Sequence, residues 1–374
     1  MLRAVKGGWK VIVRGATLRQ LTPMDEQIDL TALRDSIRDV LTNECENAIV
    51  HRHYASGDSM LQPLWTTAAE LGWLSLAIPE EYGGLGLKLD ALATLYSELG
   101  RALAPIPVLP TLLAAELIAQ GASTTHRQAW LSAIAAGEMR ATISYRGKVS
   151  GRLDGDVLTL SGRAEQLLDG GLADILIVEA TIDGEQRRVA LLPGEERFHV
   201  ETLLVSDRTR SLGRVVLDGL AIPATRVFSQ TDETVLACHA AVAIACDAVG
   251  AADAILEITI DYLKTRQQFG RAIGSFQALK HRIADHKASL VVAKASVDDL
   301  AQPRGCSLAD ALAAKAHATR SAGIVARDCI QLHGGIGFTQ ECDAHLYLRR
   351  VLLDEVLFGT IAETLDAAAL ELAA

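Results

Sequence analysis

The stretch that decides the fold, residues 262–285, reads YLKTRQQFGRAIGSFQALKHRIAD. It joins two long helical runs, because residues 240–264 before it carry apolar side chains at three- and four-residue spacing and contain no proline. Gly270 and Gly274 then interrupt the helical period with a turn. Arginine, glutamine and glycine crowd into this turn, and such a combination can hold an anion such as a pyrophosphate. The alternative interpretation is a solvated corner between two helices.

A second stretch, residues 331–350, reads QLHGGIGFTQECDAHLYLRR. Together with the RQQFG and FQ text of the first stretch, it resembles the C-terminal domain of the acyl-CoA dehydrogenase family. The N-terminal half resembles the same family at residues 71–87, LGWLSLAIPEEYGGLGL. The resemblance covers about residues 24–360. It points to the actinobacterial and proteobacterial branch that acts on steroid or other bulky acyl-CoA thioesters.

The resemblance implies a bound FAD. In the first stretch, the resemblance implies four residues that contact the pyrophosphate and adenosine portion of FAD across a subunit interface: Arg266, Gln268, Phe269 and Gln277. In the second stretch, the residues implied to close over the same region are Gln331, Gly334 and Gly335. Arginine makes paired hydrogen bonds to phosphate oxygens, and glycine lets the backbone approach a ligand closely. The resemblance also implies an acyl-CoA substrate, a homo- or heterotetramer, and an electron acceptor such as electron-transfer flavoprotein.

The composition allows more than one buried core and argues against several classes of protein. At 374 residues the chain is long enough for two or three domains. A net charge of -10 argues against general nucleic-acid binding. Although 49% of the residues are hydrophobic, no unbroken apolar stretch reaches the roughly 20 residues of a membrane span. The six cysteines form no CxxC pair, which predicts a cytoplasmic protein without a metal site.

Changes in hydrophobic period divide the chain into four parts. Residues 1–23 are basic and are interpreted as an extension without regular structure or the product of an upstream start, with a transit peptide as the alternative. Residues 24–138 have helical periodicity, and residues 139–230 have short apolar runs divided by Gly, Asp and Pro. Residues 231–374 are again helical, with a break at residues 302–305. This order predicts an α+β multidomain fold with an N-terminal helical domain, a small middle β-barrel or sandwich, and a C-terminal bundle of four or five helices.

Within these parts, the spacing predicts individual elements. Helices are expected at residues 30–50, 60–71 and 89–103, with loops at residues 80–86 and 105–110. The apolar runs that predict strands are residues 141–145, 157–161, 174–180, 188–192, 200–205 and 214–217.

The β part departs from the family pattern where it would meet the flavin ring. The family's Tyr-x-x-Thr-Glu-Pro text and the following Gly-Ser-Asp turn are absent, and residues 141–146 read ATISYR instead. The family's Trp-Ile-Thr is replaced near residues 166–170, which read QLLDG. Thr142 and Ser144 still carry hydroxyls, and these are the candidates for contacts to the isoalloxazine ring.

The reaction implied by the resemblance is the α,β-dehydrogenation of an acyl-CoA thioester. It needs a carboxylate beside the α-carbon, a polarised thioester carbonyl and the exclusion of water. The family's common glutamate, in a Tyr-Glu-Gly-Thr setting, aligns with Phe358 in LFGT. The backbone N–H of that residue can still bond the thioester carbonyl. The family's second position for the base, 22 residues before Tyr262, falls on Ala240. Both usual bases are therefore missing.

Asp247 is the candidate base that remains on the predicted helix. It follows Ala240 by two turns on nearly the same face, about 10 Å along the axis. It stands in the stretch AVAIACDAVGAA, where a lone acid is costly unless it is paired or neutral. The alternative is an aspartate paired with an arginine of a neighbouring helix. Further along, a solvated or salt-bridged face is the interpretation of Asp253, Glu257 and Asp261.

The sequence therefore predicts an FAD-dependent acyl-CoA dehydrogenase that acts on a bulky or ring-bearing acyl group. The first alternative is a non-catalytic or half-site subunit of a heteromeric acyl-CoA dehydrogenase, paired with a related chain that contributes the carboxylate. Loss of both usual bases and of the flavin-ring motifs favours this alternative, whereas the FAD motifs suit either function. The second alternative is a flavin monooxygenase or oxidase on the same fold, which no residue selects.

Overall fold

The structure is a computed structural model that describes residues 2–5, 8–13, 16–17, 28–194, 198–302 and 306–373. Its contacts divide the chain into two compact units, each built from segments far apart in sequence. Unit 1 comprises residues 1–36, 57–87 and 105–236, and unit 2 comprises residues 37–56, 88–104 and 237–374. The domain boundaries predicted after residues 23, 138 and 230 stay a prediction, because compactness alone groups helices from both halves of the chain in unit 2.

The helices of unit 1 are short: α3 (Gln62–Glu70), α5 (Val108–Gly121) and α6 (Thr124–Ala135). Of the three, only α5 is largely buried. Trp65 of α3 donates a hydrogen bond from Nε1 to the Gly137 carbonyl at 3.0 Å. The loop predicted over residues 105–110 is only partly correct, because α5 begins at Val108. Pro110 lies in the first turn of α5, where the backbone N–H that proline lacks has no helical partner in any case.

Unit 1 also holds a seven-stranded sheet, whose strands lie in the order β4-β7-β5-β6-β10-β9, with β8 paired to β7. The strands are β4 (Ala141–Ile143), β5 (Arg146–Asp154), β6 (Val157–Leu168), β7 (Ile175–Ile182), β8 (Glu185–Leu191), β9 (Val200–Leu203) and β10 (Leu212–Pro223). Alternating residues such as Leu158, Leu160 and Val178 form one core. All six predicted runs overlap strands. Sequence reasoning missed β5, because its text RGKVSGRLD is mostly polar and buries only Val149.

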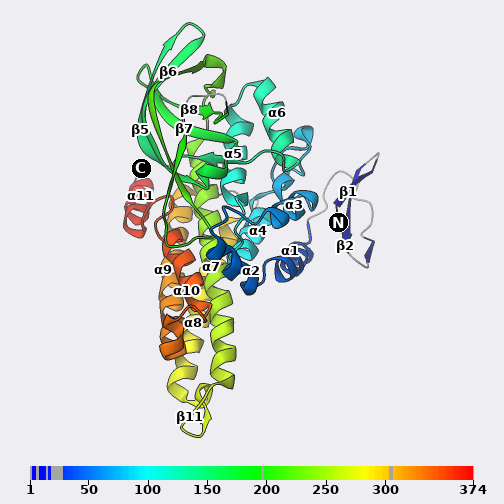
Figure 1. Ribbon diagram of the computed structural model, residues 1–374, viewed down its shortest axis with the longest axis vertical. Helices are drawn as coiled ribbons and strands as arrows, with labels where there is room; N and C mark the ends of the chain where they lie inside the picture. Colours follow the sequence, from blue (N-terminus) through cyan, green and yellow to red (C-terminus); the bar gives the residue numbers. More distant parts are fainter. Residues whose placement is uncertain are drawn as a thin grey trace. The chain divides into compact units, whose positions relative to one another are not determined.

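Unit 2 is dominated by a bundle of long helices, which run beside one another in Figure 1 with the β11 turn at one end. Its C-terminal helices are α7 (Glu233–Thr265, which begins in unit 1), α8 (Gln277–Leu300), α9 (Leu308–His333), α10 (Ala344–Asp354) and α11 (Ile361–Ala373). The predicted fold class is thus confirmed. By length and composition α7 is apolar enough to cross a membrane, but 83% of its most apolar window is buried inside the protein, as in a core helix.

Helix α4 (Leu89–Arg101) packs against α7 with backbone touching backbone. A Cβ atom added at Gly100 would lie 2.2 Å from the Asp247 carbonyl oxygen. A Cβ atom at Gly250 would lie 2.1 Å from the Ser97 carbonyl oxygen. Only glycine fits at either position without a backbone shift. The contact therefore fixes the position of the Asp247 backbone against α4.

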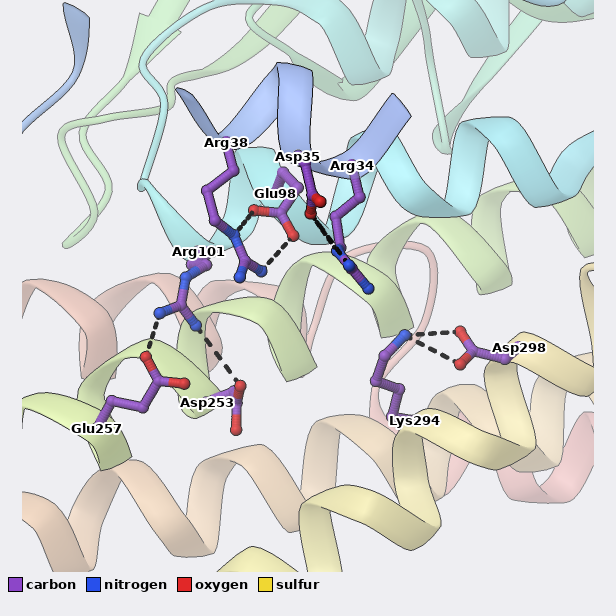
Figure 2. Close-up of polar contacts among 9 residues, drawn as sticks. All are labelled: Arg34, Asp35, Arg38, Glu98, Arg101, Asp253, Glu257, Lys294 and Asp298. Carbon is purple, nitrogen blue, oxygen red and sulfur yellow. Dashed lines mark hydrogen bonds and ion pairs between the residues drawn. The ribbon is translucent and has the colours of Figure 1, made fainter. Parts of the chain in front are cut away.

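Ion pairs also join α4 to its neighbouring helices α1 (Leu30–Glu44) and α7. Arg38 of α1 donates from Nε and Nη2 to the two oxygens of Glu98, at 2.8 and 2.7 Å. Arg101 reaches across to α7, where it contacts Glu257 and, at 3.5 Å, Asp253 (Figure 2). The salt-bridged face predicted for Asp253 and Glu257 is therefore present. The remaining helix of unit 2 is α2 (Asn47–Ser56).

The N-terminal extension contains three short antiparallel strands. They are β1 (Leu2–Val5), β2 (Gly8–Val13) and β3 (Ala16–Thr17). The expectation of an extension without regular structure is wrong for these strands. Residues 18–27 lie outside the described residues, and the predicted boundary after residue 23 lies there with them.

Candidate active site

The first polar-glycine corner is a hairpin between α7 and α8, made of β11 (Gln267–Gln268) and β12 (Arg271–Ala272). Its tip, Phe269 and Gly270, has positive φ angles of 54° and 76°. A positive φ is uncommon for an aromatic residue, and Phe269 is also 90% exposed. The other implied cofactor residues of this corner are exposed as well: Arg266, Gln268 and Gln277. The hairpin therefore presents a cation, amides and an aromatic ring away from the helices that carry it.

The second polar-glycine corner follows α9. A Cβ atom at Gly334 or Gly335 would meet nothing within 4 Å, so both glycines face open space. Gln331 beside them is exposed. The ring of Tyr262, at the end of α7, stacks on that of His333 at 4.6 Å, and its hydroxyl donates to the His333 carbonyl at 3.3 Å. The structure thus joins the two corners, 71 residues apart at this contact, within one unit.

The two corners together fit the phosphates of a dinucleotide. The exposed guanidinium of Arg266 supplies charge and paired donors. Helix α8 begins directly after the first corner, at Gln277, and the N–H groups of a helix's first turn favour an anion. The glycines of the second corner leave room for a ligand against the backbone.

The two hydroxyl candidates of the β part have partners inside unit 1. Thr142 is fully buried and donates from Oγ1 to the Leu168 carbonyl at 2.6 Å. Ser144 is 5% exposed, and its Oγ accepts from the backbone N–H of Glu179 at 3.4 Å. A flavin contact by either hydroxyl stays a prediction. Gln166, in the segment that replaces the family's Trp-Ile-Thr, has a φ of 54° at an irregularity between β6 and β10.

Asp247 is fully buried and is bound to an arginine. Arg350 of α10 donates from Nη1 to both carboxylate oxygens of Asp247, each at 3.3 Å. Neither side chain is more than 1% exposed. This is the pairing with an arginine of a neighbouring helix that stood as the alternative to the catalytic role. The structure shows the Asp247 carboxylate engaged in a buried ion pair, and its role as a base stays a prediction.

The turn between α10 and α11 contains the residues that align with the family's Tyr-Glu-Gly-Thr. Phe358 and Gly359 have positive φ angles of 53° and 104°. A capping box follows them: Glu363 Oε2 accepts from the backbone N–H of Thr360 at 2.8 Å, and Thr360 Oγ1 accepts from the backbone N–H of Glu363 at 3.3 Å. The position that carries glutamate in the family therefore carries a phenyl ring on a turn of defined geometry.

Sequence reasoning missed a buried lysine beneath this turn. Lys315 of α9 is 1% exposed, and its Nζ donates to the Gly359 carbonyl at 2.6 Å and to Thr364 Oγ1 at 3.3 Å. Burial lowers the pKa of Lys315 from 10.5 to about 8, while the carboxylate of Asp354 acts in the opposite direction. The available signal was a lysine within the alanine-rich text ADALAAKAHA.

A buried polar pair beside Ala240 was missed as well. His239 is 4% exposed, and its Nε2 shares a 2.9 Å hydrogen bond with the hydroxyl of Tyr96, which is fully buried on α4. The sequence offered no signal for this pair, because the two residues are 143 positions apart.

Comparison with known proteins agrees with this architecture. The family models described as acyl-CoA dehydrogenase N-terminal domain and C-terminal domain match residues 28–138 and 236–370. The chain is 33% identical over 338 residues to acyl-CoA dehydrogenase IpdE2 of Mycobacterium tuberculosis, covering 88% of this chain and 92% of that protein.

Two solved structures are similar over nearly their whole length. The ChsE4-ChsE5 complex from Mycobacterium tuberculosis has a TM-score of 0.84 and 26% identity, covering 94% of this chain and 99% of that chain. A variant of the Tcur3481-Tcur3483 steroid ACAD has a TM-score of 0.83 and 28% identity, covering 92% of this chain and 98% of that chain.

The chain therefore belongs to the acyl-CoA dehydrogenase family. It is an oxidoreductase of the acyl-CoA dehydrogenase type, and both the predicted family and the predicted enzyme class are confirmed.

Proposed function

We propose that this protein takes part in the FAD-dependent α,β-dehydrogenation of an acyl-CoA thioester with a bulky, ring-bearing acyl group. The observation that carries the proposal is the contact between Tyr262 and His333, which joins the two polar-glycine corners in one unit. The likeness to a steroid ACAD supports the bulky acyl group.

In this proposal the two corners hold the pyrophosphate and adenosine portion of FAD. Arg266 binds phosphate oxygens, and the backbone at Gly334 and Gly335 lies against the cofactor. When bound, FAD supplies the acceptor for the hydride that leaves the β-carbon. Because the hairpin with Phe269 is exposed, it suits a cofactor held mainly by a neighbouring subunit, and so a tetramer. An acceptor such as electron-transfer flavoprotein then takes the electrons.

The turn between α10 and α11 binds the thioester carbonyl in this proposal. The backbone N–H of Phe358 donates to the carbonyl oxygen and so stabilises the negative charge that develops there as the α-proton leaves. A backbone N–H needs no particular side chain, so this part of the site tolerates phenylalanine in place of glutamate.

Two sources remain for the carboxylate that removes the α-proton. The first is Asp247. The second is a related partner chain, in which case this protein is a half-site subunit of a heterotetramer. The ion pair with Arg350 favours the second source, because the guanidinium engages both oxygens of the Asp247 carboxylate at a fully buried position. The likeness to the ChsE4-ChsE5 complex also supports a heteromeric assembly.

The test is expression of the chain alone and together with a related chain encoded beside its gene. Each preparation is examined for the visible absorption of bound flavin and for reduction of ferricenium by ring-bearing acyl-CoA thioesters. We expect turnover with the partner only. Full turnover by the chain alone contradicts the half-site assignment, and failure of both preparations to bind flavin contradicts the proposed function as a whole.

A further inference from the structure

The turn of residues 357–360 has a conformation that must be held in place. Phe358 has a φ of 53°, and Gly359 has a φ of 104°. Residues with side chains rarely adopt positive φ angles, and such strain persists where the surroundings determine the geometry. The backbone bond from Leu357 to Leu353, at 3.1 Å, holds the chain before the turn. The capping box of α11 holds the chain after it.

Lys315 holds the middle of the turn. Its Nζ donates at 2.6 Å to the carbonyl of Gly359, the residue with the greatest rotational freedom in the segment. Thr364 Oγ1 bonds both the Lys315 Nζ, at 3.3 Å, and the same carbonyl, at 3.4 Å. This carbonyl belongs to the 359–360 peptide, so Lys315 anchors the C-terminal end of the turn. The Leu357 N–H, bonded to Leu353, anchors the N-terminal end, and the Phe358 N–H lies in the 357–358 peptide between the two anchors.

A structural explanation from packing alone does not account for a lysine at this point. The side chain is 1% exposed, and burying a charge is costly unless it is paired and hydrogen-bonded. An apolar residue of similar length would fill the same space without that cost. The carboxylates that face the ammonium are Asp354 of α10, which is fully buried, and Glu363 of α11. The lysine and its partners thus join α9, α10 and α11 at the turn.

We propose that Lys315 is a positioning residue, which holds the turn of residues 357–360 so that the Phe358 backbone N–H binds the carbonyl of the acyl-CoA thioester. The inference rests on the proposed function, in which that N–H is the carbonyl's donor. Lys315 itself contacts the protein backbone and not the substrate.

The test compares Lys315→Met with Lys294→Met, which removes the same charge from an exposed site on α8 (56% exposed side chain). Two ligands are used: benzoyl-CoA and S-benzyl-CoA, which differ only by a carbonyl in place of a methylene. Neither can undergo α,β-dehydrogenation, so binding is measured by titration calorimetry without turnover. Hydrogen exchange at the backbone amides of residues 358–360 is measured in parallel.

We expect the wild-type protein to prefer benzoyl-CoA by about three- to tenfold, the factor of one neutral hydrogen bond. Lys315→Met brings the ratio of the two affinities close to one and speeds amide exchange at residues 358–360, whereas Lys294→Met changes neither. If Lys315→Met alone does not fold, Lys315→Met with Asp354→Asn removes the opposing carboxylate too and is judged by the same ratio.

Retention of the carbonyl preference in a folded Lys315 variant overturns the inference. Absence of the preference in the wild type overturns the inference together with the carbonyl-binding role proposed for the Phe358 N–H. Dehydrogenation of a ring-bearing acyl-CoA by that same protein still leaves the proposed reaction standing. A wild-type protein that shows neither the preference nor dehydrogenation, with or without its partner chain, overturns both.

Discussion

Replacing Arg350 with methionine is expected to leave a charged carboxylate without its guanidinium inside unit 2. In the Arg350→Met variant, Asp247 loses a charge 3.3 Å away, and neither side chain is more than 1% exposed, so solvent does not substitute for it. With an effective dielectric constant of about 20, two unit charges at this separation attract by about 5 kcal/mol. Allowing for desolvation of the lost partner, we expect the unfolding free energy of unit 2 to fall by about 3–5 kcal/mol.

The double variant Asp247→Leu with Arg350→Met is the matched control. It leaves no charge from this pair buried, and replacing a buried ion pair by apolar residues of similar volume is often neutral or stabilising. We therefore expect the double variant to regain most of the stability that the single variant loses.

Urea unfolding followed by two signals provides the assay. All four tryptophans belong to the sequence ranges of unit 1, so their fluorescence reports unit 1: Trp9, Trp65, Trp73 and Trp130. Far-UV circular dichroism is dominated by the long helices of unit 2. The dichroism transition should move to lower urea in Arg350→Met and return in the double variant, while the fluorescence transition stays. The reasoning is refuted if Arg350→Met unfolds like the wild type, or if the double variant is as unstable as the single one.

The same double variant also separates the two sources of the base. If it folds, binds flavin with its partner chain and still dehydrogenates acyl-CoA, Asp247 does not remove the α-proton. If it folds and binds flavin but has no turnover, Asp247 is the base, and the half-site assignment fails.

Three further perturbations test other parts of the molecule. Because the pKa of Lys315 falls from 10.5 to about 8 on folding, the unfolded chain binds more protons between these values. The unfolding free energy should therefore rise with pH across this window, by up to about 3 kcal/mol, and Lys315→Met should remove that rise in pH-dependent urea unfolding. Arg266→Ala should lower flavin retention during gel filtration at least about tenfold, as expected for a charged hydrogen bond to phosphate, whereas Lys264→Ala nearby should not; equal retention in both would contradict the phosphate assignment. Gly100→Ala should destabilise unit 2 by about 1–3 kcal/mol in urea unfolding, because its Cβ would overlap α7, whereas Gly194→Ala, where a Cβ meets nothing within 4 Å, should change stability little.

The sequence predicted the regular elements well wherever burial imposes a period. Most of the long apolar helix α7 and the first part of strand β6, residues 157–161, follow directly from their spacing. Strand β5 was missed because its residues are mostly exposed, so no apolar alternation marks it. The start of α5 was missed because Pro110 was interpreted as a loop signal, although proline is compatible with the first turn of a helix.

The site was predicted less completely, because its decisive contacts join distant residues. Local spacing placed Asp247 in an apolar helix and left open whether an arginine neutralises it. It could not select Arg350 among the chain's 36 basic residues, since the two are 103 positions apart. The contact from Lys315 to Gly359 spans 44 residues, and the only hint in the sequence was a lysine within an alanine-rich segment. The polar-glycine corners were visible because each is a local motif.

The exposed hairpin tip has a consequence for how the protein is handled. Phe269 and Gly270 extend beyond the helices that carry them, so a FAD bound as proposed draws part of its affinity from a neighbouring chain. Cofactor loading and subunit association then form one linked equilibrium. Dilution that separates the subunits should release the cofactor, and added FAD should drive the subunits together. The yellow colour of a purified sample would thus report its state of assembly as well as its cofactor content.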